Sequence, residues 1–185
     1  MGSCKFTNEL DRLRKSSNDS IDHVEKFDKF KKYMHVNRTA EEDLKDILRR
    51  VNASGKKTLV LLCGSAGDGK SHLLSYLKNS DEERLIDNYV VYNDASESTA
   101  PSMTGIQTLN NLLDSFKDYN LDMPGQNVIL AINLGVLSNF IESEYGDGFK
   151  ILKKYVKSSD ILTTKINIKD FDEESHFQHV SFSNM

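Results

Sequence analysis

Residues 58–76, TLVLLCGSAGDGKSHLLSY, contain the pattern that decides the fold of this chain. The segment begins with an unbroken apolar run, TLVLLC, which is typical of a strand buried on both faces of a sheet. A glycine-rich turn follows, and apolar residues then recur at helical spacing in KSHLLSY. The segment therefore predicts a buried strand, a tight turn and a helix, the unit from which parallel α/β sheets are built.

The turn also fits a phosphate-binding motif, the P-loop. Gly64, Gly69, Lys70 and Ser71 have the spacing G-x-x-x-x-G-K-S, in the strand, turn and helix context that the motif requires. Glycines allow successive N–H groups to point inward as an anion-binding nest at a helix start. We expect the loop to bind ATP through Gly64, Ser65, Gly67, Asp68, Gly69, Lys70, Ser71 and His72.

Three side chains of this loop have distinct expected roles. Lys70 places a positive charge against the terminal phosphates, and the Ser71 hydroxyl is expected to bind a Mg²⁺ ion that keeps most of its waters. His72 is expected to donate its backbone N–H to the inner phosphate and not to act as a catalytic imidazole. The expected cofactors are therefore ATP and Mg²⁺.

The sequence departs from the usual pattern at the acidic residue that normally helps to hold the magnesium ion. Hydrolysis at a site of this kind normally needs an acidic residue at the end of a later strand. The apolar strand at residues 128–132 ends in Asn133, which carries no charge, and Asp94 after the strand at residues 89–92 is the nearest acidic alternative. We expect Asp94 to join Ser71 as a metal ligand, and Lys70, Asp94 and Asn133 to be the catalytic residues. Two other interpretations stay open: Asp94 begins an Asx turn, or Asn133 contacts the γ-phosphate as a polar sensor.

The composition is that of a soluble globular protein, with 38% hydrophobic and 28% charged residues among 185. No apolar run approaches the roughly 18 residues needed to cross a bilayer, and the first residues lack the apolar core of a secretory signal. We therefore expect a cytoplasmic protein without membrane contact. The net charge of -4 argues against a surface that binds polyanions in bulk. Two cysteines, Cys4 and Cys63, are too few for a disulfide framework.

The rest of the chain predicts an α/β fold, a P-loop NTPase three-layer sandwich with a mostly parallel sheet. Strands are expected at residues 58–63, 89–92 and 128–132, with strand-like patterns at 165–171 and 179–182. Helices are expected at residues 20–36, 39–52, after Lys70, after a Thr104 cap, at 137–142 and at 149–155. We assign residues 1–53 to a helical N-terminal extension and 54–185 to the NTPase domain, which is expected to be incomplete at its C-terminal end.

A wider resemblance covers residues 54–149. The runs LCGSAGDGKSHLLSYLK, YNDASES and VILAINLGVLSNFIESEYG together resemble the amino-terminal part of the DptF-type ATPases of phosphorothioation-dependent DNA restriction systems. The resemblance implies a longer protein that uses ATP within a multiprotein complex acting on DNA that lacks sulfur on its backbone phosphates. It implies other restriction-complex subunits as partners, with DNA reached through the complex, and homo-oligomer formation is a further expectation.

Two other functions remain open from the residues alone. A nucleotide-dependent switch with little turnover is favoured by the missing acid after the 128–132 strand. A small-molecule phosphotransferase would need a second substrate pocket, for which the sequence offers no candidate. An arginine that stabilises the transition state is expected to come from a neighbouring molecule, because no arginine in this chain is placed by sequence near the γ-phosphate.

Overall fold

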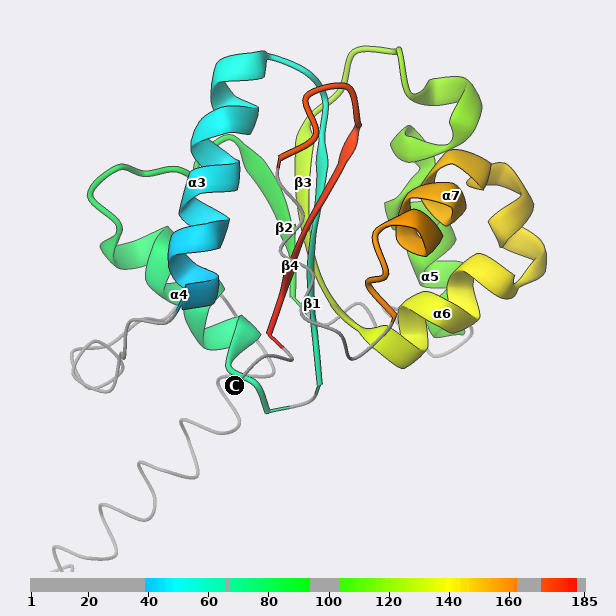
Figure 1. Ribbon diagram of the computed structural model, residues 1–185, viewed down its shortest axis with the longest axis horizontal. Coiled ribbons are helices and arrows are strands. Elements are labelled where there is room, and N and C mark those ends of the chain that lie inside the picture. Colours follow the sequence, from blue (N-terminus) through cyan, green and yellow to red (C-terminus); the bar gives the residue numbers. More distant parts are fainter. Residues whose placement is uncertain (1–38, 66, 94–103, 163–170, 183–185) are drawn as a thin grey trace, which may run out of the picture.

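The structure, a computed structural model, describes residues 39–65, 67–93, 104–162 and 171–182. In these residues the chain forms a four-stranded, all-parallel sheet with helices on both faces (Figure 1). The predicted α/β class with a parallel sheet is confirmed. The helix predicted at residues 20–36, and the strand pattern at 165–171 except its last residue, lie outside the described residues.

The elements follow the predicted order along the chain. The strands are β1 (Leu59–Gly64), β2 (Tyr89–Tyr92), β3 (Asn127–Asn133) and β4 (Phe177–Ser181). The α-helices are α3 (Thr39–Ser54), α4 (Lys70–Ser80), α5 (Gly105–Leu112), α6 (Leu134–Glu142) and α7 (Lys150–Ser158). Short 3-10 helices, η1 (Asp114–Phe116), η2 (Asp118–Asn120) and η3 (Glu144–Gly148), connect some of them. The first three strands lie within one residue of their predicted bounds, whereas β4 begins two residues earlier than predicted.

The strand order in the sheet is β2-β3-β1-β4, so β1 lies between β3 and β4. Leu59 at the start of β1 is paired with Phe177 of β4, and Gly64 at its end is paired with Asn133 of β3. Because all strands run in the same direction, their carboxyl ends meet at one edge, the lower end of the sheet in Figure 1. We call this the carboxyl edge. Open α/β sheets bind ligands at this edge.

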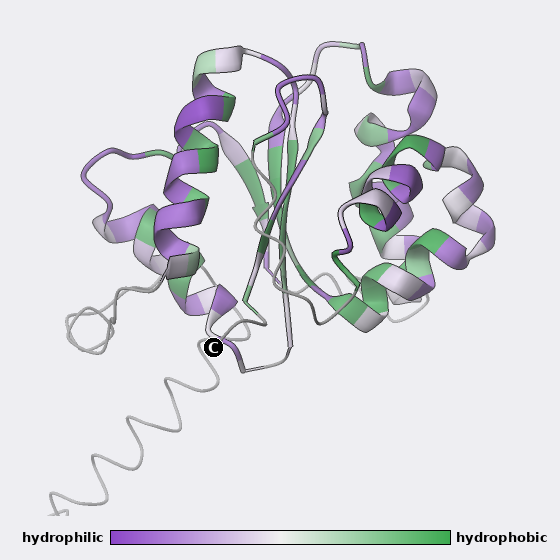
Figure 2. Cartoon of the chain, viewed as in Figure 1, coloured by the Kyte–Doolittle hydropathy of each residue, from purple (hydrophilic) through white to green (hydrophobic). Residues whose placement is uncertain are grey.

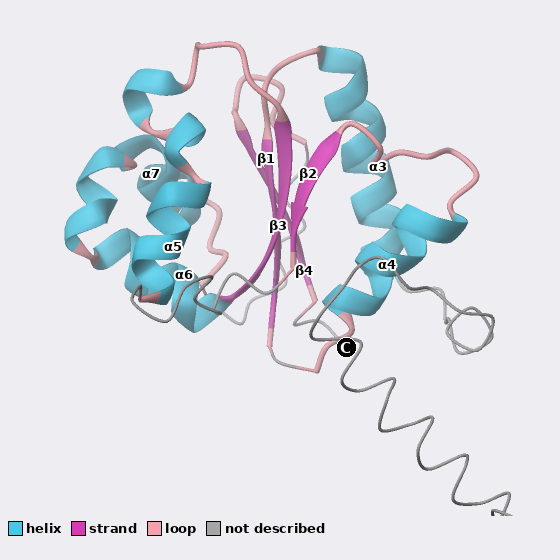
Figure 3. Ribbon diagram, turned by 180° about the vertical axis from the view of Figure 1, so that it is seen from behind, coloured by secondary structure: helices cyan, strands magenta, loops and turns pink. Residues whose placement is uncertain are grey.

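The sheet has an apolar cluster on each face. Leu59, Leu61 and Cys63 of β1 contribute to the cluster under α5, α6 and α7, and Val60 and Leu62 contribute to the cluster under α3 and α4. This alternation is the two-residue period of a strand, and it explains why every residue of β1 is buried. Figure 3 shows the two helical layers on either side of the sheet, and Figure 2 shows apolar residues on the helix sides that face it.

Helix α3 forms part of one of these layers. Its buried stripe contains the predicted Leu44, Ile47, Leu48 and Val51, which lie in one cluster with Val60 of β1. Burial of each of these side chains contributes on the order of 2 kcal/mol, far more than the helix propensity of any one residue. The segment assigned to an N-terminal extension thus contributes, through α3, to the same sandwich as the β1–α4 unit.

The cap predicted for α5 is confirmed. Thr104 precedes the helix, its hydroxyl accepts a hydrogen bond from the Gln107 N–H, and the Gln107 side chain accepts one from the Thr104 N–H. This reciprocal arrangement satisfies two backbone donors at the helix start. The helix therefore begins where the Thr104 signal predicted.

Lys57 forms stabilising contacts at the opposite edge of the sheet, where the strands begin. Its ammonium is in a buried side chain and donates to the carbonyl oxygens of Ser115 at 2.8 Å and Asn120 at 2.6 Å, over the ring of Phe116. Burial lowers the pKa of the Lys57 ammonium, and the charge of Asp122 opposes this effect. The contacts join the chain just before β1 to η1 and η2.

Replacing Lys57 by methionine is expected to lower the free energy of unfolding by about 1–2 kcal/mol, because two part-buried hydrogen bonds to carbonyl groups are lost while the side-chain volume is kept. The matched control is Lys56→Met. Lys56 donates to two carbonyls as well, those of Glu173 and Glu174, but on the surface, so its loss should cost less than about 0.5 kcal/mol. Urea unfolding of both variants measures the difference, and equal losses would contradict the role given to Lys57.

Candidate functional site

The loop between β1 and α4 (the β1–α4 loop), of which the structure describes residues 65 and 67–69, lies at the carboxyl edge. Gly67 and Gly69 have φ values of 84° and 90°, in the left-handed region that glycine adopts without steric cost. Gly69 is also the N-cap of α4, and no side chain caps this helix start. The loop therefore brings a helix N-terminus, with its positive dipole end, to the edge where ligands bind.

Two charged side chains fold onto this loop, and both contact Ser65. The Lys70 ammonium donates to the Ser65 carbonyl oxygen at 2.6 Å. The Ser65 N–H donates to Oδ2 of Asp68. The backbone of Ser65 is thus held at its N–H by a carboxylate and at its carbonyl by an ammonium.

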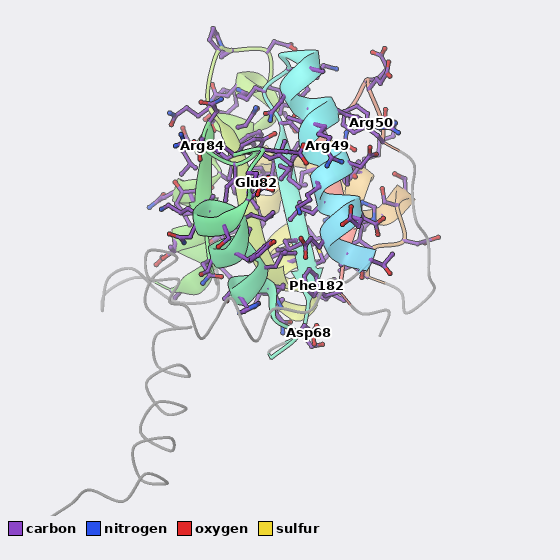
Figure 4. All side chains as sticks on the ribbon, turned by 90° about the vertical axis from the view of Figure 1, so that its left-hand side faces the viewer. Arg49, Arg50, Asp68, Glu82, Arg84 and Phe182 are labelled. Atoms are coloured by element: carbon purple, nitrogen blue, oxygen red, sulfur yellow. The ribbon has the colours of Figure 1, made fainter. Side chains whose placement is uncertain are left out.

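Glycine is needed at position 64 because neighbouring side chains lie where the Cβ of any other residue would be. A Cβ added to Gly64 would lie 2.6 Å from Asp68 Oδ2, 2.9 Å from Phe182 Cβ and 3.4 Å from Lys70 Nζ. Figure 4 places Asp68 and Phe182 at the same end of the sheet. The space that a side chain at position 64 would fill is therefore occupied by the charged groups of the loop.

Asn133 lies beside this loop on the neighbouring strand. It is the register partner of Gly64, and it follows Ile129 and Ala131 on the sheet face covered by α3 and α4. Its Oδ1 accepts a hydrogen bond of 2.8 Å from the Gly135 N–H, so the side chain caps α6. With Oδ1 used as the cap, the amide group has its N–H donors left for a ligand, which suits an anion better than a cation.

The other predicted site residues fall into two groups. Ser71 and His72 lie half-buried in the first turn of α4, beside Lys70. Asp94 lies outside the described residues. The structure therefore brings the loop residues and Asn133 to one place and gives no position for the predicted acidic ligand.

Asn93 is a candidate that the sequence analysis missed. It follows β2 directly, and its Oδ1 is buried with no hydrogen-bond partner among the described residues. Tyr89 and Val91 of β2 pack into the α3/α4 cluster, so the two-residue period places Asn93 on that face as well. A buried acceptor of this kind normally has a partner. The sequence already indicated this position of Asn93, because the first, third and fifth residues of the strand pattern YVVYN lie on one face.

Cys63 lies one residue before the loop but takes no part in it. Burial raises the pKa of its thiol to about 12, and the positive charge of Lys70 opposes this effect only in part. The thiol is therefore protonated and unreactive, as expected for a buried apolar residue. Cys4 lies outside the described residues.

Two histidines in the described part of the chain make contacts between segments that are distant in the sequence. Nδ1 of His176 lies 2.8 Å from the Lys57 carbonyl oxygen, and Nδ1 of His179 lies 2.9 Å from the Tyr155 hydroxyl. Among the described residues, no three His, Cys, Asp or Glu side chains are grouped so that they could hold a metal ion. Among the described residues, Ser71 is therefore the predicted ligand for a magnesium ion at the β1–α4 loop.

Comparison of the chain with protein-family models, with curated proteins and with solved structures gave no match. In the part of the chain that the structure describes, none of the helices combines the length and apolar character needed to cross a membrane.

Proposed function

We propose that this chain binds ATP with Mg²⁺ at the β1–α4 loop and hydrolyses it as part of a larger cytoplasmic assembly. The observation that carries the proposal is the meeting of the Lys70 ammonium, a helix N-terminus and the Cβ-free position of Gly64 at the carboxyl edge. A phosphate group needs backbone donors, a positive charge and close approach to the backbone, and this loop supplies all three.

The roles of the surrounding residues follow from their positions. Lys70 would leave the Ser65 carbonyl and bind the terminal phosphates, and the Ser71 hydroxyl would bind the metal. Mg²⁺, when bound, neutralises phosphate charge that develops during phosphoryl transfer. Asn133 would donate its amide N–H to the γ-phosphate, in agreement with the sensor interpretation. Asn93 Oδ1 would accept a hydrogen bond from a metal-bound water, and Asp94 remains the proposed acidic ligand.

The restriction-system assignment rests on the sequence resemblance. Under this proposal the partners are other restriction-complex subunits or further copies of this chain, DNA is reached through them, and a partner supplies the arginine for the transition state. The competing proposal is a nucleotide-dependent switch. It is favoured by Asn133, because an uncharged side chain stands at the end of the strand next to β1 and cannot act as a base.

The test is calorimetric titration of the wild-type chain with ATP and with ADP, with and without Mg²⁺, beside Asn133→Asp. The wild type is expected to bind both nucleotides, with Mg²⁺ strengthening ATP binding. Asn133→Asp keeps the oxygen that caps α6 but replaces the amide donor by a negative charge. It should weaken ATP binding about tenfold and ADP binding much less.

Three outcomes of this titration, combined with an assay of ATP turnover, would decide against parts of the proposal. Failure of the wild type to bind any nucleotide would refute nucleotide binding altogether. Tighter Mg²⁺-ATP binding by Asn133→Asp would mean that residue 133 faces the metal and not the phosphate. Binding without turnover, even with partner subunits added, would favour the switch.

A further inference from the structure

The carboxylate of Asp68 lies inside the β1–α4 loop, over Gly64. Its Oδ2 accepts the hydrogen bond of the Ser65 N–H and lies 2.6 Å from the point that a Cβ of Gly64 would take. The Lys70 ammonium lies 3.4 Å from the same point. An anionic oxygen of the protein is therefore already placed among the donors that a phosphate would use.

A carboxylate and a phosphate cannot share this position. Two negative charges a few ångströms apart repel each other strongly where water is partly excluded, and both would need the same Ser65 N–H. A phosphate entering the loop must therefore displace Asp68. It must also draw Lys70 away from the Ser65 carbonyl, so that both contacts of Ser65 break together.

We propose that Asp68 is an internal competitor for the nucleotide phosphate and sets the affinity of the loop. This inference rests on the proposed function. The chain exists in two arrangements, one with the Asp68 carboxylate over Gly64 and one with it turned out to solvent, and only the second accepts a phosphate. The apparent dissociation constant then exceeds the intrinsic one by the inverse of the fraction of chains in the second arrangement.

The decisive variant is Asp68→Asn, which keeps the shape of the side chain and removes its charge. Titration with Mg²⁺-ATP is expected to show binding about tenfold tighter than in the wild type, because a charge-assisted hydrogen bond no longer has to be given up. Asp68→Ala, which also removes the acceptor, should bind at least as tightly. The control is Asp46→Asn, an exposed carboxylate on α3 paired with Arg50, which makes the same change in net charge.

A second measurement does not depend on nucleotide. The amide proton of Ser65, hydrogen-bonded to a carboxylate in the free wild type, should give an NMR signal shifted well downfield. The signal should move upfield in Asp68→Ala, because this variant lacks the carboxylate that accepts the hydrogen bond. Thermal unfolding of each variant shows whether it is folded.

The outcomes separate this inference from the proposed function. If the wild type binds Mg²⁺-ATP and Asp68→Asn binds it equally or less tightly, Asp68 is not a competitor, although nucleotide binding stands. If Asp68→Asn binds and the wild type does not, the competitor role of Asp68 is supported, whereas nucleotide binding by the wild-type chain is refuted. If neither protein binds Mg²⁺-ATP although both are folded, both proposals are refuted.

Discussion

Alanine in place of Lys70 is expected to lower the affinity of the chain for Mg²⁺-ATP by about a hundredfold, the cost of losing a charge-assisted contact to phosphate. The ammonium is 3.4 Å from the Cβ position of Gly64 and donates a hydrogen bond to the Ser65 carbonyl oxygen of the loop. It is therefore placed to move onto a ligand at that point. Isothermal titration calorimetry measures the loss.

The matched control for this variant is Lys78→Ala. Lys78 is exposed in the last turn of the same helix, α4, so it changes the net charge equally but lies at the end far from the loop. Its affinity should stay within about twofold of the wild type, because an exposed charge more than a Debye length away is largely screened. Equal losses in the two variants would indicate a general charge effect and contradict a specific role of Lys70.

Gly146→Ala is expected to destabilise the fold by about 3 kcal/mol, the upper part of the usual range for inserting a methyl group into a packed site. Gly146 is buried in η3, and an added Cβ would fall on the carbonyl oxygen of Ile141 and lie 2.8 Å from its carbonyl carbon. Ile141 belongs to α6, so the backbone itself would have to move. Phe140 precedes η3 in the chain and Phe149 follows it, and the edge-to-face contact of their rings would be disturbed.

Gly148, two residues later in the same short helix, provides the control. A Cβ there would lie 3.8 Å from the side chain of Lys117, an ordinary van der Waals distance, and its φ is not in the left-handed region. Gly148→Ala should change the free energy of unfolding by less than about 0.5 kcal/mol. Chemical denaturation of both variants gives the comparison, and a small effect at Gly146 would mean that α6 and η3 can separate at little cost.

Much of the fold could be predicted from the sequence, because its signals are local. The apolar runs that form β1, β2 and β3, the Thr104 cap and the leucine stripe of α4 depend on residue period and on hydrogen bonds between near neighbours. The place of α3 and the early start of β4 depend on contacts between distant segments. Leu59 pairs with Phe177 across the whole domain, and residue period alone does not determine such a partner.

The place of the candidate site in the fold was predictable to the same extent. The spacing of Gly64, Lys70 and Ser71 located the loop, and its place at the carboxyl edge beside Asn133 agrees with that prediction. The inward position of the Asp68 carboxylate was not predictable, since a motif gives spacing and not side-chain direction. The role of Asp94 as a metal ligand stays a prediction, because the structure does not describe this residue.

The position of β1 in the sheet also affects how the domain is made. β1 acquires its neighbour β3 after residue 133, but the other side of β1 stays open until Phe177–Ser181 has left the ribosome. During synthesis the strand that leads into the β1–α4 loop therefore has an unpaired edge, available to β4 but also to strands of other chains. Pairing with β4 covers this edge of β1, and the outer edge of β4 then becomes the edge of the described sheet.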